Sequence, residues 1–207
     1  MNPVINFAVS EVGKRSAAFN FFLIGIGGPG GTGKSTFAKN LSEYLQESVV
    51  ISLDDYRFSR EERSKTGLKG SNPAANRIVL IKEHFDLLRS GNSIKKPVYD
   101  HSTGKTDNSE ILKPERYIIA EGELAFSDEL IGSFDLNFFL DSDHTTQLNS
   151  RMKRDKSSKN LTEAEIKTLF YESNISDFGK FYAHNKKNAD IILFSDNKYN
   201  LSIISVR

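Results

Sequence analysis

The chain has no cysteine among its 207 residues, and neither sign of charge is in excess. The absence of cysteine excludes a disulfide framework, a thiolate metal site and a cysteine nucleophile. The 28 lysines and arginines nearly balance the 27 aspartates and glutamates, which leaves a formal net charge of +1. Neither nucleic acid nor a membrane surface is therefore indicated as a partner.

Long apolar runs are also absent, and none approaches the roughly 20 residues of a membrane-spanning helix. A secretory signal is not expected at residues 14–28, because the apolar stretch there is short, contains Asn20 and runs directly into a glycine-rich loop. These absences favour a cytoplasmic protein. Length and an apolar fraction of 38% favour one domain over residues 1–207, and a homo-oligomer is compatible with the sequence.

Short apolar runs predict strands that are buried on both faces of a parallel sheet. Apolar residues three or four positions apart predict the intervening helices. This alternation of strands and helices indicates an α/β fold, a parallel sheet flanked by helices. The predicted strands cover 21–26, 49–53, 117–120, 136–140 and 191–194, and the predicted helices cover 35–46, 74–89, 147–155 and 162–181.

Three segments carry less regular patterns. Residues 56–73 are expected to form a polar loop beside the site, and residues 94–112 a small hairpin. Residues 1–18 allow two interpretations, a helix packed over the sheet or a mobile arm. The aromatic residues just before the first glycines, Phe19 included, are expected in the core of the first strand.

A glycine-rich loop between a predicted strand and a predicted helix carries the strongest functional signal. Its sequence, Gly-Pro-Gly-Gly-Thr-Gly-Lys-Ser over 28–35, matches a phosphate-binding pattern. Glycines let backbone amides turn toward phosphate oxygens, and the following helix adds its dipole. Lysine supplies a positive charge and serine an oxygen suited to Mg²⁺. The residues expected to bind the nucleotide are Gly28, Gly30, Gly31, Thr32, Gly33, Lys34, Ser35 and Thr36.

Acidic residues follow several predicted strands, where ligands bind in α/β sheets. Asp54, Asp55 and Glu121 are candidates for base catalysis or metal binding. For Asp141 we prefer the start of a solvated loop, because Asp143 follows it and could cap the next helix.

From the glycine loop nearly to its C-terminus, the chain resembles the family of uridine kinases and phosphoribulokinases. Ile-Ser-Leu-Asp-Asp-Tyr at 51–56 is similar to the segment that holds the family's catalytic base, here Asp54. Ile-Ala-Glu-Gly-Glu-Leu-Ala-Phe at 119–126 is similar to the family's acidic strand end. The resemblance implies a magnesium site of Ser35, Asp54 and Glu121, and acceptor contacts from Asp54, Tyr56, Tyr99 and His101.

Residues 151–155 resemble the start of the family's lid, which we place approximately at 143–178. The resemblance implies that Arg151 and Arg154 join Lys34 and Asp54 as catalytic residues by reaching over the phosphates. A solvated basic helix face is the competing interpretation of these arginines. Lys159 is a candidate to replace a further lid arginine, although lysine lacks the fork geometry of arginine.

The resemblance implies a three-layer P-loop NTPase fold and a kinase that uses ATP and Mg²⁺ to phosphorylate a hydroxyl of a small molecule. We expect a nucleoside such as uridine or cytidine as acceptor, with a sugar phosphate, pantothenate or glycerate as alternatives. Gly104 stands where uridine kinases place a histidine, and residues 101–104 look more like phosphoribulokinases. An ATP-binding regulatory switch with slow hydrolysis is the alternative from another class.

Overall fold

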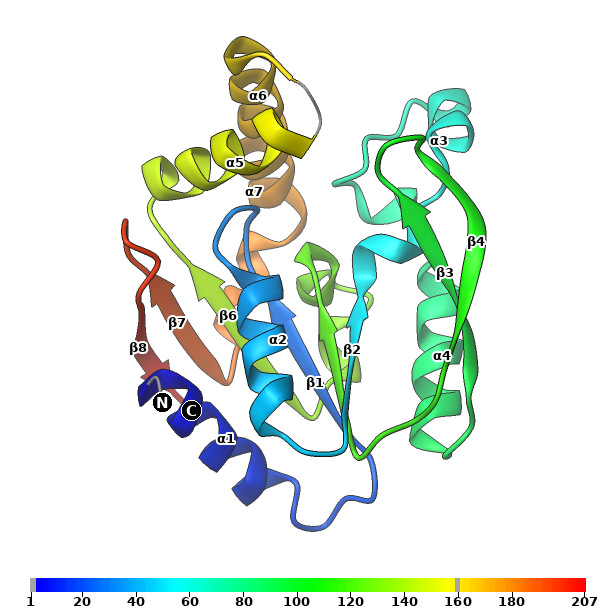
Figure 1. Ribbon diagram of the computed structural model, residues 1–207, viewed down its shortest axis with the longest axis vertical. Helices are drawn as coiled ribbons and strands as arrows, with labels where there is room; N and C mark the ends of the chain where they lie inside the picture. The colour runs from blue at the N-terminus through cyan, green and yellow to red at the C-terminus, as the bar shows by residue number, and fades with distance from the viewer. Residues whose placement is uncertain (1–2, 159–160) are drawn as a thin grey trace.

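The computed structural model describes residues 3–158 and 161–207, and it contains one central sheet with helices against both faces (Figure 1). The strand order is β2-β5-β1-β6-β7-β8. The first five of these strands run parallel and β8 pairs antiparallel with β7. The α/β prediction is confirmed. The strands are β1 (Phe22–Gly27), β2 (Ser48–Ser52), β5 (Tyr117–Glu121), β6 (Leu136–Asp141), β7 (Ile191–Ser195) and β8 (Leu201–Val206).

Adjacent residues of each central strand enter different cores, because successive side chains of a strand point to opposite faces. Phe22 and Ile24 join a core with α1 and α2, whereas Leu23 between them joins a core with α4. Burial on both faces explains why the strands are continuously apolar. The helices in these two layers are α1 (Pro3–Arg15), α2 (Lys34–Tyr44) and α4 (Ile78–Arg89).

The N-terminal stretch is a helix packed over the sheet, the first of the two alternatives left open by its sequence. Val4, Ile5, Ala8 and Val12 of α1 are buried, at the spacing of one helical stripe. At the end of the helix, Arg15 Nη2 donates to the carbonyl oxygen of Arg207 at 2.6 Å. Helix α1 therefore lies against one face of the sheet, and its last residue contacts residue 207.

Several details differ from the sequence-based prediction. The expected polar loop contains α3 (Arg60–Thr66), which begins at a capping box of Ser59 and Glu62. The antiparallel strand β8 was not predicted, and Phe19 is 40% exposed rather than part of the first strand's core. The predicted helix at 162–181 is divided by a π-helix at Tyr171–Asp177, between α6 (Glu163–Phe170) and α7 (Phe178–Phe181).

Two substructures project beyond the carboxyl ends of the parallel strands (Figure 1). One contains α5 (His144–Ser158), α6 and α7, which together occupy the segment expected to be a lid. The other is α3 with the turn of the hairpin formed by β3 (Ile94–Asp100) and β4 (Lys105–Leu112), whose strands run alongside α4. Lys159 lies outside the described residues. In the described parts of the chain, no helix combines the length and apolar character needed to cross a lipid bilayer.

Candidate active site

The glycine loop connects β1 to α2 and admits no side chain at two of its positions. Gly28 has φ +134°, and a Cβ there would lie 2.0 Å from the carbonyl oxygen of Leu140. Gly31 has φ +85°, and its Cβ would lie 2.6 Å from the carbonyl oxygen of Gln147. Glycine is thus required by both backbone conformation and packing. The loop is held against β6 and α5 while it leads into the first turn of α2, whose amides are available to an anion.

Two polar side chains of the loop converge on one of its own carbonyl groups. Lys34 Nζ donates to the carbonyl oxygen of Pro29 at 2.9 Å, and Thr32 Oγ1 donates to the same oxygen at 3.0 Å. The lysine ammonium therefore lies over the loop, where its charge can meet a phosphate. Thr36, in the first turn of α2, lines a cavity beside the loop.

Ser35 and Glu121 are brought together because β1 and β5 are adjacent in the sheet. Ser35 Oγ donates to Glu121 Oε1 at 3.1 Å. Burial raises the pKa of Glu121, and the charge of Lys34 opposes that shift. A hydroxyl and a carboxylate suit Mg²⁺, which needs few protein ligands because it keeps several waters and binds phosphate oxygens. The described residues contain no group of three or more acidic or histidine side chains arranged for a metal, so Mg²⁺ would depend on the nucleotide for its other ligands.

Asp54 follows β2 in a short 3₁₀ turn at Leu53–Tyr56. Arg57 Nη2 contacts Asp54 Oδ1 at 2.9 Å, while the aspartate side chain stays 48% exposed. The Arg57 guanidinium lowers the pKa of Asp54, and the charges of Lys34, His101 and Arg154 act in the same direction. Asp54 is thus an accessible, ionised carboxylate beside the phosphate loop, as a base for a hydroxyl requires.

The other acidic residues at strand ends have structural contacts. Asp55 Oδ1 accepts from the backbone nitrogen of Tyr99 at 3.1 Å, and its Oδ2 pairs with the buried Lys96 of β3. Asp55 therefore anchors the hairpin. Asp143 caps α5 as expected, since its Oδ1 accepts from the backbone nitrogen of Thr146 at 2.8 Å.

The acceptor side of the site contains an arginine cluster, which we define as Arg57, Arg60 and Arg63. Arg63 Nη2 donates to the hydroxyl of Tyr99 at 2.9 Å, and Arg57 lies 5.5 Å from the centre of the Tyr99 ring. Arg60 Nη2 approaches the carbonyl oxygen of His101 at 3.4 Å. The polar, glycine-containing sequence of this segment predicts a loop and hides the cluster, although arginine at every third position is a visible signal.

Tyr99 and His101 lie together on the hairpin, whereas Tyr56 does not join them. The rings of Tyr99 and His101 meet edge to face with centroids 5.0 Å apart. Tyr56 is 0% exposed, and its hydroxyl lies 2.8 Å from Nδ1 of the buried His84. This position corrects the expectation that Tyr56 contacts the acceptor, since its side chain points into the core beneath the site.

We expect Tyr56→Phe to lower the free energy of unfolding by about 1 kcal/mol, because it leaves the buried His84 without this partner. The KM for the acceptor should not change. Urea unfolding and steady-state kinetics would measure both, and a raised KM with unchanged stability would restore Tyr56 to the binding site.

The two lid arginines occupy different environments. Arg151 is 8% exposed, and its Nη1 donates to Ser173 Oγ at 2.5 Å and to Asn174 Oδ1 at 2.7 Å. The side chain of Arg154 is 56% exposed, with Nε bonded to Asp155 at 2.8 Å. The interpretation as a solvated basic helix face therefore fits the exposed Arg154, whereas it does not fit the buried Arg151.

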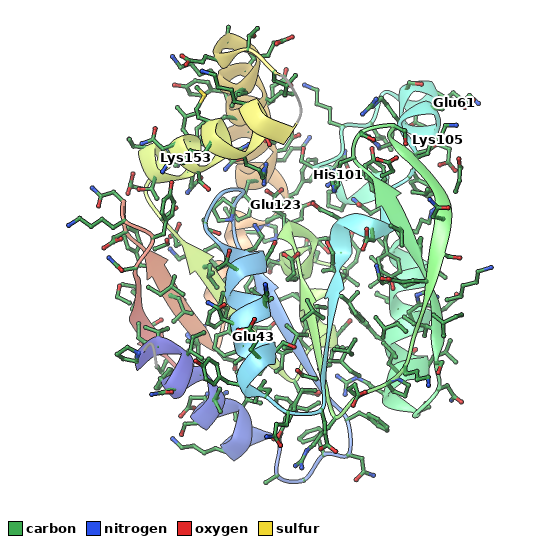
Figure 2. The ribbon with its side chains drawn as sticks, viewed as in Figure 1. Glu43, Glu61, His101, Lys105, Glu123 and Lys153 are labelled. Carbon is green, nitrogen blue, oxygen red and sulfur yellow. The ribbon has the colours of Figure 1, made fainter. Side chains whose placement is uncertain are left out.

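Glu123 was part of a recognised motif but was given no role in the sequence analysis. Figure 2 shows Glu123 and His101 at the carboxyl edge of the sheet, between the α5–α7 substructure and the hairpin. A Cβ on Gly30 would lie 3.2 Å from Glu123 Oε1, which places this carboxylate next to the phosphate loop. Burial raises the pKa of Glu123, and Lys34 opposes the shift.

A cavity of about 510 Å³ adjoins the phosphate loop on the side of α1 and β8. The ammonium of Lys153 lies 5.3 Å from the centre of the Tyr199 ring at its rim. The cavity is continuous with the first turn of α2. Its lining residues are Ile5, Thr32, Gly33, Thr36, Phe37, Asn40, Ser150, Lys153, Arg154, Ser195, Tyr199 and Leu201.

A mostly parallel sheet with a Gly-x-x-x-x-Gly-Lys-Ser loop between β1 and α2 defines a P-loop kinase fold, here with a carboxylate and two arginines beside the loop. The sequence model of the Phosphoribulokinase / Uridine kinase family matches residues 23–200, and the chain belongs to this family of kinases.

Known proteins of two activities are similar to this chain. Phosphoribulokinase of Synechocystis sp. is 33% identical over 175 residues, which cover 83% of this chain and 52% of that protein. Uridine kinase of Halobacterium salinarum is 30% identical over 179 residues, which cover 83% of this chain and 79% of that protein. The chain thus spans about half the length of the phosphoribulokinase. The solved D-glycerate 3-kinase of Cryptococcus neoformans var. grubii shares the fold, with a TM-score of 0.75, 13% identity and coverage of 99% of each chain.

Proposed function

We propose that this chain transfers the terminal phosphoryl group of ATP, with Mg²⁺, to a hydroxyl of a small anionic alcohol such as a sugar phosphate. The observation that carries the proposal is the arginine cluster beside Tyr99. Three guanidinium groups, each always charged, lie beside Asp54, His101 and Tyr99, where we place the acceptor. A phosphate or carboxylate on the acceptor can form bidentate contacts there.

The residues of the chain divide the reaction between them. Asp54 accepts the proton of the acceptor hydroxyl, while Arg57 keeps the carboxylate ionised. Lys34 and the loop amides stabilise charge on the phosphoryl oxygens, and Arg151 adds positive charge from the lid. ATP supplies the transferable phosphoryl group. Ser35 and Glu121 would hold the accompanying Mg²⁺.

The cavity next to Thr36 is the proposed place for the base and ribose of ATP. It begins at the phosphate loop and combines an aromatic ring, Tyr199, with polar groups from Asn40 and Ser195. Such a mixture of apolar wall and few polar groups is usual for a nucleotide pocket.

The proposal is tested by following ADP release with Mg²⁺ and ATP across sugar phosphates, glycerate, pantothenate, uridine and cytidine. We expect an anionic alcohol to accelerate ADP release well above the rate with water alone. Stimulation by uridine or cytidine only would instead support a nucleoside kinase, for which the Tyr99–His101 ring pair is the available base platform. Slow release that no acceptor changes would support the regulatory switch.

Arg63→Ala is expected to raise the KM for the anionic acceptor about 10-fold to 100-fold, because a charge-assisted contact of about 1.5–3 kcal/mol is lost. The KM for ATP should change little. Lys65→Ala is the matched control, since Lys65 is an exposed cation on the same helix that pairs with Glu61. If both substitutions raised the KM for the acceptor equally, the effect would come from the general attraction of α3 for anions and not from specific contacts of the arginine cluster.

A further inference from the structure

Asn174 lies at the centre of a buried polar network between the lid and the phosphate loop. It is 4% exposed and belongs to the π-helix at Tyr171–Asp177. Its Nδ2 donates to the carbonyl oxygen of Gly30 at 2.7 Å and to Gln147 Oε1 at 3.0 Å. Its Oδ1 accepts from Arg151 Nη1 at 2.7 Å. One amide side chain therefore contacts the loop, helix α5 and a lid arginine together.

The contact with Gly30 constrains the direction of a loop amide. In a trans peptide the carbonyl oxygen and the amide hydrogen point in opposite directions. Holding the Gly30 oxygen toward Asn174 therefore turns the N–H of Gly31 to the opposite side of the loop. Backbone N–H groups of such a loop bind phosphate only when they point toward it, so the contact with Asn174 fixes the direction of one potential phosphate donor.

The contact with Arg151 constrains the lid. Arg151 Nη1 also donates to Ser173 Oγ, and Nε lies 3.5 Å from the fully buried Asp155. Fixing one end of a guanidinium leaves fewer orientations for its remaining N–H groups, which lowers the entropy lost when they engage phosphate. π-Helical segments of this kind occur often at functional sites.

We propose that Asn174 is a positioning residue that couples the phosphate loop to Arg151 by donating to Gly30 and accepting from the arginine. This inference rests on the proposed binding of Mg·ATP. Asn174 need not touch the nucleotide. It sets the direction of one loop peptide and the direction of one lid guanidinium through the two ends of a single amide.

The test is calorimetric titration of Mg·ATP into the whole chain and into Asn174→Ala. We expect the Kd to rise about tenfold, the effect of losing one well-formed hydrogen bond together with the order it imposes. Asn185→Ala is the matched control. Asn185 is also 4% exposed, and its Nδ2 donates to the carbonyl oxygen of Phe126 at 3.1 Å rather than to the phosphate loop. The Asn185→Ala variant should lose about as much stability as Asn174→Ala and keep its affinity for Mg·ATP.

Coupling requires a second comparison. If the two residues act together, Arg151→Ala in the Asn174→Ala background should raise Kd by clearly less than it does in the parent chain. Asn174→Asp serves if the alanine variant does not fold, because it is the same shape and still accepts from Arg151 but cannot donate to Gly30. We expect it to weaken Mg·ATP binding at least tenfold, since charge repulsion adds to the lost donor.

The outcomes separate this inference from the proposed function. Unchanged affinity in the Asn174 variants, an equal loss in Asn185→Ala, or independent effects of Asn174 and Arg151 would each overturn the coupling while leaving a working kinase. Failure of the parent chain to bind Mg·ATP would overturn both.

Discussion

Asp54→Asn is expected to reduce acceptor-dependent ADP release by about 10²–10⁴-fold, the usual contribution of a positioned general base. The amide keeps the shape of the side chain and cannot take the proton of a hydroxyl. Its pair with Arg57, which lowers the pKa of Asp54, disappears as well. Single-turnover measurements at saturating acceptor would show the loss in the chemical step rather than in binding.

Asp107→Asn provides the comparison for Asp54→Asn. Asp107 is an exposed aspartate on β4 of the hairpin, 3.8 Å from Lys105, so its replacement removes the same charge without entering the site. Its turnover should match that of the parent chain. Turnover that survives in Asp54→Asn would assign the proton to another group, and Glu123 beside the phosphate loop would be the next carboxylate to replace.

The parts of the fold and site that could be predicted from sequence are those set by local pattern. The phosphate loop depends on glycines that are contiguous in the chain, and its strand and helix follow from apolar spacing. Asp54 and Glu121 lie at predictable strand ends, which parallel strands bring to one edge of the sheet. Their proximity to Lys34 thus follows from the order of elements.

Residues whose position depends on distant partners could not be predicted in this way. Lys96 is 3% exposed in a strand because acidic side chains from positions 55 and 110 surround it, and no spacing in the hairpin indicates that burial. Asn174 lies in a segment with ordinary helical periodicity, where the π-helix changes which side chains face the phosphate loop. Strand β8 is short and rich in serine, and its pairing with β7 is a tertiary contact.

The burial of Tyr56 illustrates the limit of a motif. It directly follows Asp54 and Asp55, and the resemblance placed Tyr56 near the acceptor together with Asp54. The 3₁₀ turn at Leu53–Tyr56 instead sends neighbouring side chains in different directions, with Asp54 toward solvent, Asp55 toward the hairpin and Tyr56 toward His84. Sequence adjacency predicted the location of the turn but not the direction of each side chain.

Lys34→Ala is expected to lower turnover by about 10²–10³-fold and to weaken Mg·ATP binding, because a preorganised charge at the phosphoryl oxygens typically contributes about 3–4 kcal/mol. Within the described residues the ammonium donates to the neutral carbonyl oxygen of Pro29, so the stability of the fold should fall by no more than about 1 kcal/mol. Function and folding should therefore separate in this variant.

Lys39→Ala is the control for this separation, since Lys39 is an exposed lysine further along the same helix α2. It should bind Mg·ATP and turn over like the parent chain. Calorimetry and ADP release would be measured on both variants at matched ionic strength, because screening weakens any general attraction between a basic surface and ATP. Equal losses in the two variants would mean that net charge on α2 governs nucleotide binding. A loss confined to Lys34→Ala would place the phosphoryl oxygens over the loop, within reach of the Lys34 ammonium beside Pro29.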